Sequence, residues 1–105
     1  MRLSFNTKYL RTICEDENNA IQEYGESVTN KLKSRLADLI ACTNIDDMVA
    51  GNPKIIESDR NQDISIKLDD EYKMIIRANH TINPIDKSGK VDWKRVHSIK
   101  IMSID

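Results

Sequence analysis

The sequence has 105 residues, of which 39% are hydrophobic and 31% are charged, and its formal net charge is −1. This length predicts one domain over residues 1–105, and no apolar run approaches the roughly 18 residues that a membrane-spanning helix needs. The charge is divided unevenly: residues 1–71 carry nine Lys and Arg against fourteen Asp and Glu, a net of −5, and residues 72–105 carry seven against three, a net of +4. The division favours two surfaces with different partners, or it is an uneven spread of surface charge without further meaning.

The first residues predict a strand followed by a helix. Leu3 and Phe5 lie on one side of the short run Arg2–Phe5, as they would in a strand. Asn6 or Thr7 then caps a helix, because a short side-chain oxygen at that position accepts a hydrogen bond from a free backbone N–H. The apolar side of this helix consists of Tyr9, Leu10, Ile13 and Cys14.

The strongest helical pattern follows a polar cluster at 15–19. Six apolar residues recur every three or four positions and so form one stripe of a helix: Ile21, Tyr24, Val28, Leu32, Leu36 and Leu39. Gly25 lies inside this pattern, where glycine costs about 1 kcal/mol relative to alanine. We therefore expect a break near Gly25 and a longer helix over 26–42, so that residues 8–42 form a helical hairpin.

The second half of the chain predicts strands joined by turns. After a connector rich in Asp, Asn, Gly and Pro, residues Lys54–Ser58 form a short strand. Alternating apolar and polar residues over 63–78 predict a β-hairpin, whose turn is the acidic segment 69–71. Residues 79–92 read as a loop, and a last strand follows it.

This order of elements predicts an α+β fold. An N-terminal strand and a helical hairpin come first, and antiparallel strands then form a mainly antiparallel curved sheet with the helices on one face. No segment is left to cover the other face. That face is therefore either wet or a binding surface.

The predicted hairpin places cations on this uncovered face. Its inward-facing residues are Ile64, Ile66, Leu68, Tyr72, Met74 and Ile76. Because neighbouring residues of a strand point to opposite faces, Lys67, Lys73 and Arg77 share the outer face. Three cations on one face of two paired strands favour a site for a polyanion, although a solvated sheet face has the same pattern.

Cysteine usage and the N-terminus indicate the compartment. Cys14 and Cys42 lie in apolar helical patterns, as expected of buried thiols in a reducing environment. Arg2 is followed by a strand-like run and not by the apolar stretch of a secretory signal, so we expect a cytoplasmic protein. No His or Cys lies at metal-ligand spacing, so the sequence predicts no metal and no other cofactor.

Several stretches occur in a characteristic order along nearly the whole chain. They are Tyr24-Gly25 followed by 31–39, then 44–48 followed by Gly51-Asn52-Pro53, then Asp59-Arg60 before 64–68 and 72–76, and finally Trp93 before 101–105. In order and spacing they resemble the RelE/ParE superfamily of bacterial toxins, and within it the HigB-like branch, the plasmid maintenance killer proteins. The resemblance implies a RelE-like fold and a toxin of a type II toxin–antitoxin pair.

The resemblance also implies an activity and partners. Such toxins enter the ribosomal A site and cut the mRNA there, which inhibits translation. A cognate antitoxin, in this branch a HigA-like helix-turn-helix protein, neutralises the toxin, and the complex represses its own promoter. The expected partners are therefore the antitoxin, the ribosome and mRNA, with no membrane and with DNA only through the antitoxin.

The resemblance assigns some of the family's site residues to positions of this sequence. Lys67 matches a basic position of the first hairpin strand, and Lys73 stands where the family commonly has Arg. Asp105 matches the Asp of a closing Asp-Tyr-His, and this sequence ends before the Tyr and His. Cleavage of RNA by its own 2′-OH needs a base, cations for the phosphorane and an acid, so we expect Lys67, Lys73, Arg77 and Asp105 to be catalytic.

Other cations are candidates for contacts with RNA phosphates or the ribosome. With His97 they are Lys54, Arg60, Lys94, Arg95 and Lys100. ParE-like relatives act on DNA gyrase and cut nothing. A non-catalytic binding toxin of that type, or an inactive or interaction-only relative, is therefore the alternative to a metal-independent endoribonuclease.

Overall fold

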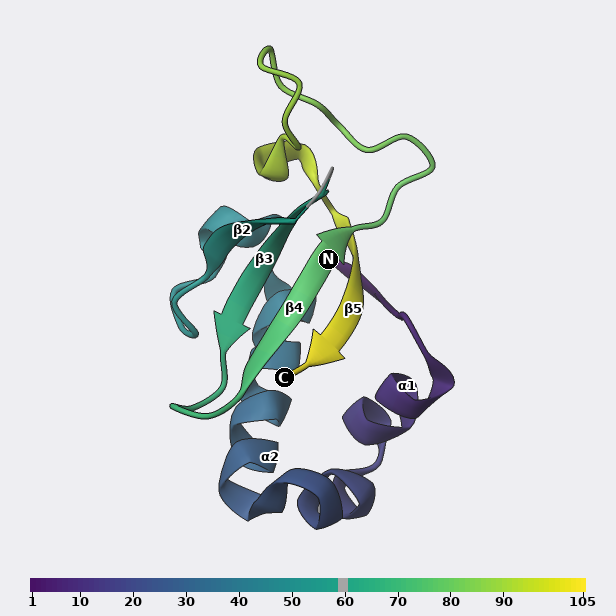
Figure 1. Ribbon diagram of the computed structural model, residues 1–105, viewed down its shortest axis with the longest axis vertical. Helices are drawn as coiled ribbons and strands as arrows, with labels where there is room; N and C mark the ends of the chain where they lie inside the picture. Colours follow the sequence, from purple (N-terminus) through teal and green to yellow (C-terminus); the bar gives the residue numbers. More distant parts are fainter. Residues whose placement is uncertain (59–60) are drawn as a thin grey trace.

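A computed structural model describes residues 1–58 and 61–105 (Figure 1). Its elements are β1 (Arg2–Phe5), α1 (Lys8–Glu15), α2 (Glu17–Ala41), the 3₁₀ turn η1 (Ile45–Asp47), β2 (Lys54–Ser58), β3 (Asn61–Lys67), β4 (Lys73–Ala78), the 3₁₀ turn η2 (Trp93–Arg95) and β5 (Ser98–Ile104). The five strands form one sheet in the order β1-β5-β4-β3-β2. Only β1 and β5 pair in parallel, so the α+β fold with a mainly antiparallel sheet is confirmed.

The core lies between α2 and one face of the sheet. The long helix passes behind the strands in Figure 1. Its stripe buries Val28, Leu32, Leu36 and Leu39. The sheet side contributes Ile64, Ile66, Leu68, Met74 and Ile76 from the hairpin and Ile99 and Ile101 from β5. The predicted inner face of the hairpin is therefore confirmed for its five buried residues, and Tyr72 is half-buried against the same core. Burial of such aliphatic side chains is the main favourable term in folding.

The two helices meet at a single residue. The Thr7 hydroxyl accepts a hydrogen bond from the Leu10 N–H at the start of α1, which selects Thr7 from the two predicted caps. Asp16 ends α1, and its carboxylate accepts hydrogen bonds from the N–H groups of Asn18 and Asn19 at the start of α2. The sequence predicted a polar interruption over residues 15–19. In the structure Asp16 alone separates the two helices, and α2 begins at Glu17, earlier than expected.

Gly25 kinks α2, as expected from the sequence. Its φ of 85° and ψ of 168° are non-helical and lie in a region that is essentially restricted to glycine. Immediately before the kink, Tyr24 packs edge-on against Tyr72 at the end of the β3–β4 turn, with ring centroids 5.0 Å apart. The kink thus connects the helical layer to the end of the central hairpin.

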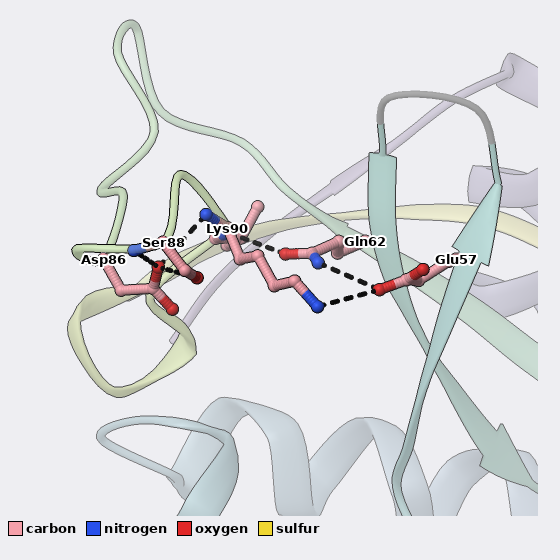
Figure 2. A network of polar contacts seen from close by, with 6 residues as sticks. Glu57, Gln62, Asp86, Ser88 and Lys90 are labelled. Carbon is pink, nitrogen blue, oxygen red and sulfur yellow. Dashed lines mark hydrogen bonds and ion pairs between the residues drawn. The ribbon is translucent and has the colours of Figure 1, made fainter.

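The loop 79–92 is tied to the opposite end of the sheet (Figure 2). Lys90 Nζ lies 3.3 Å from Oε1 of Glu57 in β2, and Gln62 Nε2 donates to the same oxygen. The Gln62 side-chain oxygen accepts a hydrogen bond from the Val91 N–H, and the Trp93 indole donates to the Gln62 carbonyl. These contacts hold a long connection against β2 and β3.

Neither α1 nor α2 is both long enough and apolar enough to cross a bilayer.

Replacement of Gly25 by alanine tests the kink. In a regular helix this change stabilises by about 1 kcal/mol, but at the observed dihedral angles we expect a loss of about 1–3 kcal/mol. Urea unfolding of Gly25→Ala measures the difference. Ser34→Ala, at an exposed position of the same helix, is the control and should change stability by less than about 0.5 kcal/mol. A stabilised Gly25→Ala variant would show that α2 is straight.

Candidate functional site

The register of β3, β4 and β5 brings three predicted site residues together on the uncovered face. Lys67 lies directly opposite Lys73 in the β3–β4 ladder. On the other side of Lys73, its backbone N–H and carbonyl both bond to the backbone of Asp105, each at 2.9 Å. Lys67, Lys73 and Asp105 therefore form a row across three strands.

A β-bulge in β5 creates this row. Ile76 pairs with Ile101, but Ile75 pairs with Ser103, so Met102 is an extra residue. In an unbroken register Ile104 would pair with Lys73. The bulge instead turns Ile104 toward the core and puts Asp105 opposite Lys73. Bulges re-aim side chains in this way, and here the re-aimed residue is Asp105, one of the predicted catalytic residues.

A groove of about 440 Å³ lies over this row. Its lining residues are Asn52, Lys54, Ser65, Lys67, Asp69, Asp70, Glu71, Tyr72, Lys73 and Asp105. The volume is within the range of sites that hold one small ligand, about 300–1,000 Å³. Three lysines face four carboxylates, so the formal charge of the lining is −1. The groove is consequently a mixed-charge site and not a simple anion trap.

The β3–β4 turn forms one wall of the groove. Asp69 accepts hydrogen bonds from the N–H groups of Glu71 and Tyr72 at 2.8 and 2.7 Å, so its carboxylate holds the turn. Asp70 is almost fully exposed and lies 3.1 Å from Lys67 Nζ. Exposed pairs of this kind contribute at most about 1 kcal/mol, so an incoming anion can displace Asp70 from Lys67.

Asp105 has a defined side-chain partner. The Ser103 hydroxyl donates a hydrogen bond to Oδ2 of Asp105 at 2.8 Å. This contact holds the carboxylate at the rim of the groove next to Lys73. A positioned carboxylate can accept a proton, and adjacent ammonium groups can stabilise a developing negative charge or return a proton.

Arg77 lies on the same face but has a different environment. Its Nε and Nη2 donate to the two carboxylate oxygens of Asp63 at 2.9 and 3.0 Å. The Asp63 side chain is 6% exposed and that of Arg77 is 34% exposed. These hydrogen bonds raise the pKa of Arg77 above its ordinary value, so the guanidinium stays charged. Arg77 is not among the groove residues, and its evident role is to neutralise a buried carboxylate.

The predicted contact residues separate into groups. Lys54 lines the groove, because its position opposite Ser65 places it on the same face. Lys100 pairs with Arg77 farther along the sheet. Lys94, Arg95 and His97 lie in or beside η2, at the end of the sheet away from the groove (Figure 1). Arg60 is outside the described residues.

Arg95 is committed to local structure. Its Nε lies 2.8 Å from Asp92 Oδ2, and its Nη2 donates to the Ile85 carbonyl at 2.9 Å. It therefore braces the loop 79–92. Lys94, beside it in η2, is exposed.

Sequence reasoning did not select Asn52, Ser65 or the acidic turn as groove residues. The alternation that put Lys67 outside also puts Ser65 outside, so this signal was present. Asn52 lies in an irregular connector without periodicity, and the sequence carries no signal for its location. Within residues 1–58 and 61–105, no three His, Cys, Asp or Glu side chains lie close enough together to hold a metal ion.

The two histidines form a pair outside the groove. Their rings are T-shaped with centroids 4.4 Å apart. The His97 backbone N–H donates to Nε2 of His80 at 3.2 Å, which requires that nitrogen to be unprotonated. Burial, together with the nearby His97, lowers the pKa of His80.

Comparison with known proteins identifies the fold. No protein-family model matches the sequence, and no curated protein is detectably similar to it. A chain of the YoeB–YefM complex from Staphylococcus aureus superposes on 100% of this chain and on 94% of its own length, with a TM-score of 0.58 and 15% sequence identity. The chain has a RelE/YoeB-like fold. A heterotetrameric YoeB–YefM toxin–antitoxin complex from the same organism gives a TM-score of 0.56 at 16% identity, covering 98% of this chain and 92% of that chain.

The RelE-like fold expected from the sequence is therefore confirmed over the whole chain. At 15–16% sequence identity, the similarity lies in the arrangement of the helices and strands. The groove is thus a site on a fold shared with a chain of a toxin–antitoxin complex.

Removal of Arg77 should destabilise the protein more than removal of a groove lysine. Arg77→Ala leaves the Asp63 carboxylate buried without its partner, so we expect a loss of about 1–3 kcal/mol. Lys73→Ala changes an exposed side chain and should shift stability by less than about 0.5 kcal/mol. Chemical denaturation of both variants measures the difference. Equal, small effects would contradict a structural role for Arg77.

The histidine pair predicts a loss of stability on acidification. The unfolded chain binds the His80 proton at the ordinary pKa of about 6.5, and the folded chain binds it only at lower pH. The contribution of neutral His80 to the free energy of unfolding should therefore be fully present above about pH 6.5, and it should decrease as the pH drops toward the lowered pKa of His80. The free energy of unfolding, measured by chemical denaturation between pH 7.5 and 5, should vary less with pH for His80→Gln than for the wild type. Parallel pH profiles would contradict this assignment.

Proposed function

We propose that this chain is the toxin of a type II toxin–antitoxin system and a ribosome-dependent, metal-independent mRNA endonuclease of the RelE/ParE superfamily. The observation that carries the proposal is the groove. Lys67, Lys73 and Asp105, which the sequence resemblance selects at three separate points of the chain, line one groove on the uncovered face. Lys54 adds a third cation to it.

The proposed reaction uses the RNA's own 2′-hydroxyl. Asp105 accepts the 2′ proton, and the 2′ oxygen attacks the adjacent phosphorus. Lys67 and Lys54 stabilise the charge of the phosphorane, and Lys73 donates a proton to the leaving 5′ oxygen. The bond from phosphorus to the 5′ oxygen breaks, which leaves a 2′,3′-cyclic phosphate and a 5′-hydroxyl. Every group in this scheme belongs to the groove or the RNA.

The fold supports an antitoxin partner. Two solved structures with a similar fold are complexes of YoeB with YefM, and one of them is described as a toxin–antitoxin complex. We propose that this chain is likewise neutralised by a cognate antitoxin. A HigA-like helix-turn-helix antitoxin, a role in plasmid maintenance and a cytoplasmic location remain parts of the proposal that follow from the sequence resemblance to the HigB-like branch.

A second candidate is a non-catalytic toxin that acts on DNA gyrase. The charge of the groove favours it, because four carboxylates beside three lysines weaken attraction for a polyanion. In this case the groove would contact a protein surface.

Mapping of mRNA 5′ ends distinguishes these candidates. Expression in bacterial cells without the antitoxin should produce new 5′ ends inside translated codons. Lys73→Ala should reduce their yield by about 10²–10⁴-fold, the usual contribution of a proton-transfer group. Lys31→Ala is the matched control, because it removes an exposed lysine of α2 that is outside the groove lining.

Three results would be decisive. New ends in the wild type and the control, but not in Lys73→Ala, support an A-site nuclease. Growth arrest with intact mRNA and a DNA damage response would replace it with the gyrase candidate. Neither arrest nor cleavage would leave an inactive or interaction-only relative.

A further inference from the structure

The β3–β4 turn carries the acidic wall of the groove, residues 69–71, and its two ends are anchored differently. Leu68, at the start of the turn, is 3% exposed and belongs to the core. Tyr72, at its end, is half-buried, packs against the core and also lines the groove. The three acidic residues between them are all at least partly exposed. The position of the acidic wall therefore depends on how firmly Leu68 and Tyr72 are held.

Hydrogen bonds tie the backbone of Tyr72 to the rest of the turn. Its carbonyl accepts hydrogen bonds from the N–H groups of Leu68 and Asp69 at 3.0 and 3.2 Å. Its own N–H donates to the Asp69 carboxylate at 2.7 Å. The next residue is Lys73, whose N–H and carbonyl both bond to the backbone of Asp105. A displacement of Tyr72 would therefore move the acidic wall and Lys73 together.

The side chain of Tyr72 is held from the helical layer by Tyr24. The two rings are T-shaped, with centroids 5.0 Å apart and an interplanar angle of 80°. Aromatic pairs favour this edge-to-face geometry, so the contact restricts the orientation of the Tyr72 ring as well as its position. Burial, together with the neighbouring Tyr9 and Glu23, raises the pKa of Tyr24 to about 12. The ring of Tyr24 consequently stays neutral in this contact.

The backbone at Gly25 sets the place of Tyr24. Helix α2 changes direction at Gly25, the residue that follows Tyr24. Among the described residues, no side chain beyond its chain neighbours lies within 4 Å of a Cβ atom placed at position 25. Glycine is therefore needed there for its backbone conformation and not for lack of space. The kink directs Tyr24 to the end of the central hairpin, where it meets Tyr72.

We propose that Tyr24 is a positioning residue for the groove: through the ring of Tyr72 it fixes the β3–β4 turn and Lys73 in place. The inference rests on the proposed function for the reaction that Lys73 assists. Tyr24 is not among the groove residues, so it acts on a bound substrate only through Tyr72. Proton transfer depends closely on geometry, and a misplacement of about 1 Å caused by a distant mutation can lower a rate by about 10²-fold.

The simpler explanation is that the two rings only add buried apolar surface to the fold. Variants of Tyr24 separate the two explanations. Tyr24→Phe keeps the edge-to-face contact and loses only the hydroxyl, whereas Tyr24→Leu keeps an apolar side chain but removes the ring. If the pair serves only stability, Tyr24→Leu should behave like any other variant that is destabilised to the same extent.

Ile99 supplies matched controls for a general loss of stability. It is fully buried, and it pairs with Ala78, at the end of β4 opposite to Lys73. Ile99→Val and Ile99→Ala remove increasing parts of this side chain, so they give a graded loss of stability that brackets the loss in Tyr24→Leu. Thermal unfolding places all the variants on one scale, and each is assayed below its unfolding temperature.

The first measurement is single-turnover cleavage of a short mRNA on purified bacterial ribosomes. Tyr24→Leu should lower the maximal cleavage rate about tenfold, with little change in the protein concentration that gives half of that rate. Tyr24→Phe and both Ile99 variants should stay within about twofold of the wild type. A rate within about twofold of the wild type for Tyr24→Leu, or an equal loss in the Ile99 variants, overturns the positioning role.

Hydrogen exchange provides a second measurement that does not depend on catalysis. The N–H groups of Leu68, Asp69 and Tyr72 are the donors that close the turn. Their exchange should become about tenfold faster in Tyr24→Leu, because the turn opens locally without the clamp on Tyr72. It should stay within about twofold of the wild type in Tyr24→Phe and Ile99→Val. Unchanged exchange in Tyr24→Leu overturns the inference.

Together the two measurements separate this inference from the proposed function. If the wild type cuts mRNA and Tyr24→Leu cuts it equally fast, the nuclease proposal holds and the positioning role is wrong. If the wild type cuts no mRNA but exchange in the turn responds to Tyr24→Leu alone, the nuclease proposal is wrong and Tyr24 still positions the wall of the groove.

Discussion

The position of β4 between β3 and β5 is the constraint on which the rest of the structure depends. Successive side chains of a strand point to opposite faces, so a shift of one residue in either pairing would exchange the core and the exposed face. The observed register buries Met74 and Ile76 under α2 and leaves Lys73 outside. Packing of the aliphatic core therefore selects which cations face solvent. The groove is a consequence of how the opposite face of the same strands is buried.

The uncovered face divides its charged residues between stability and binding. Arg77 is paired through two hydrogen bonds with the buried Asp63, so its removal would leave a charge without a partner. Lys67 and Lys73 are exposed, and the contact of Lys67 with Asp70 is weak enough to exchange. The charged residues at the two ends of the sheet differ in the same way. At the end next to η2, Arg95 supports the loop 79–92. At the other end, the lysines of the groove are accessible to a ligand.

The groove itself is assembled from segments that are distant in the chain. The connector supplies Asn52, the central hairpin supplies two lysines and the acidic wall, and the last residue supplies Asp105. The kink at Gly25 adds support from the helical layer through Tyr24 and Tyr72. A mixed-charge lining of this kind suits a ligand that carries phosphates and hydrogen-bonding groups together, such as a nucleotide within an RNA strand.

Sequence alone determined the elements and the face on which each hairpin residue lies, because those properties follow from local periodicity. The stripe from Ile21 to Leu39, the break at Gly25 and the alternation around Lys67 and Lys73 are all short-range patterns. Tertiary structure decided which of the exposed residues meet. The bulge at Met102 aligns Asp105 with Lys73. Arg77 pairs with the buried Asp63 and lies outside the groove lining. The close packing of Gly51 against Ile66 places Asn52 at the edge of the groove. Each of these depends on contacts between strands or connectors far apart in the sequence, and no local pattern encodes such contacts.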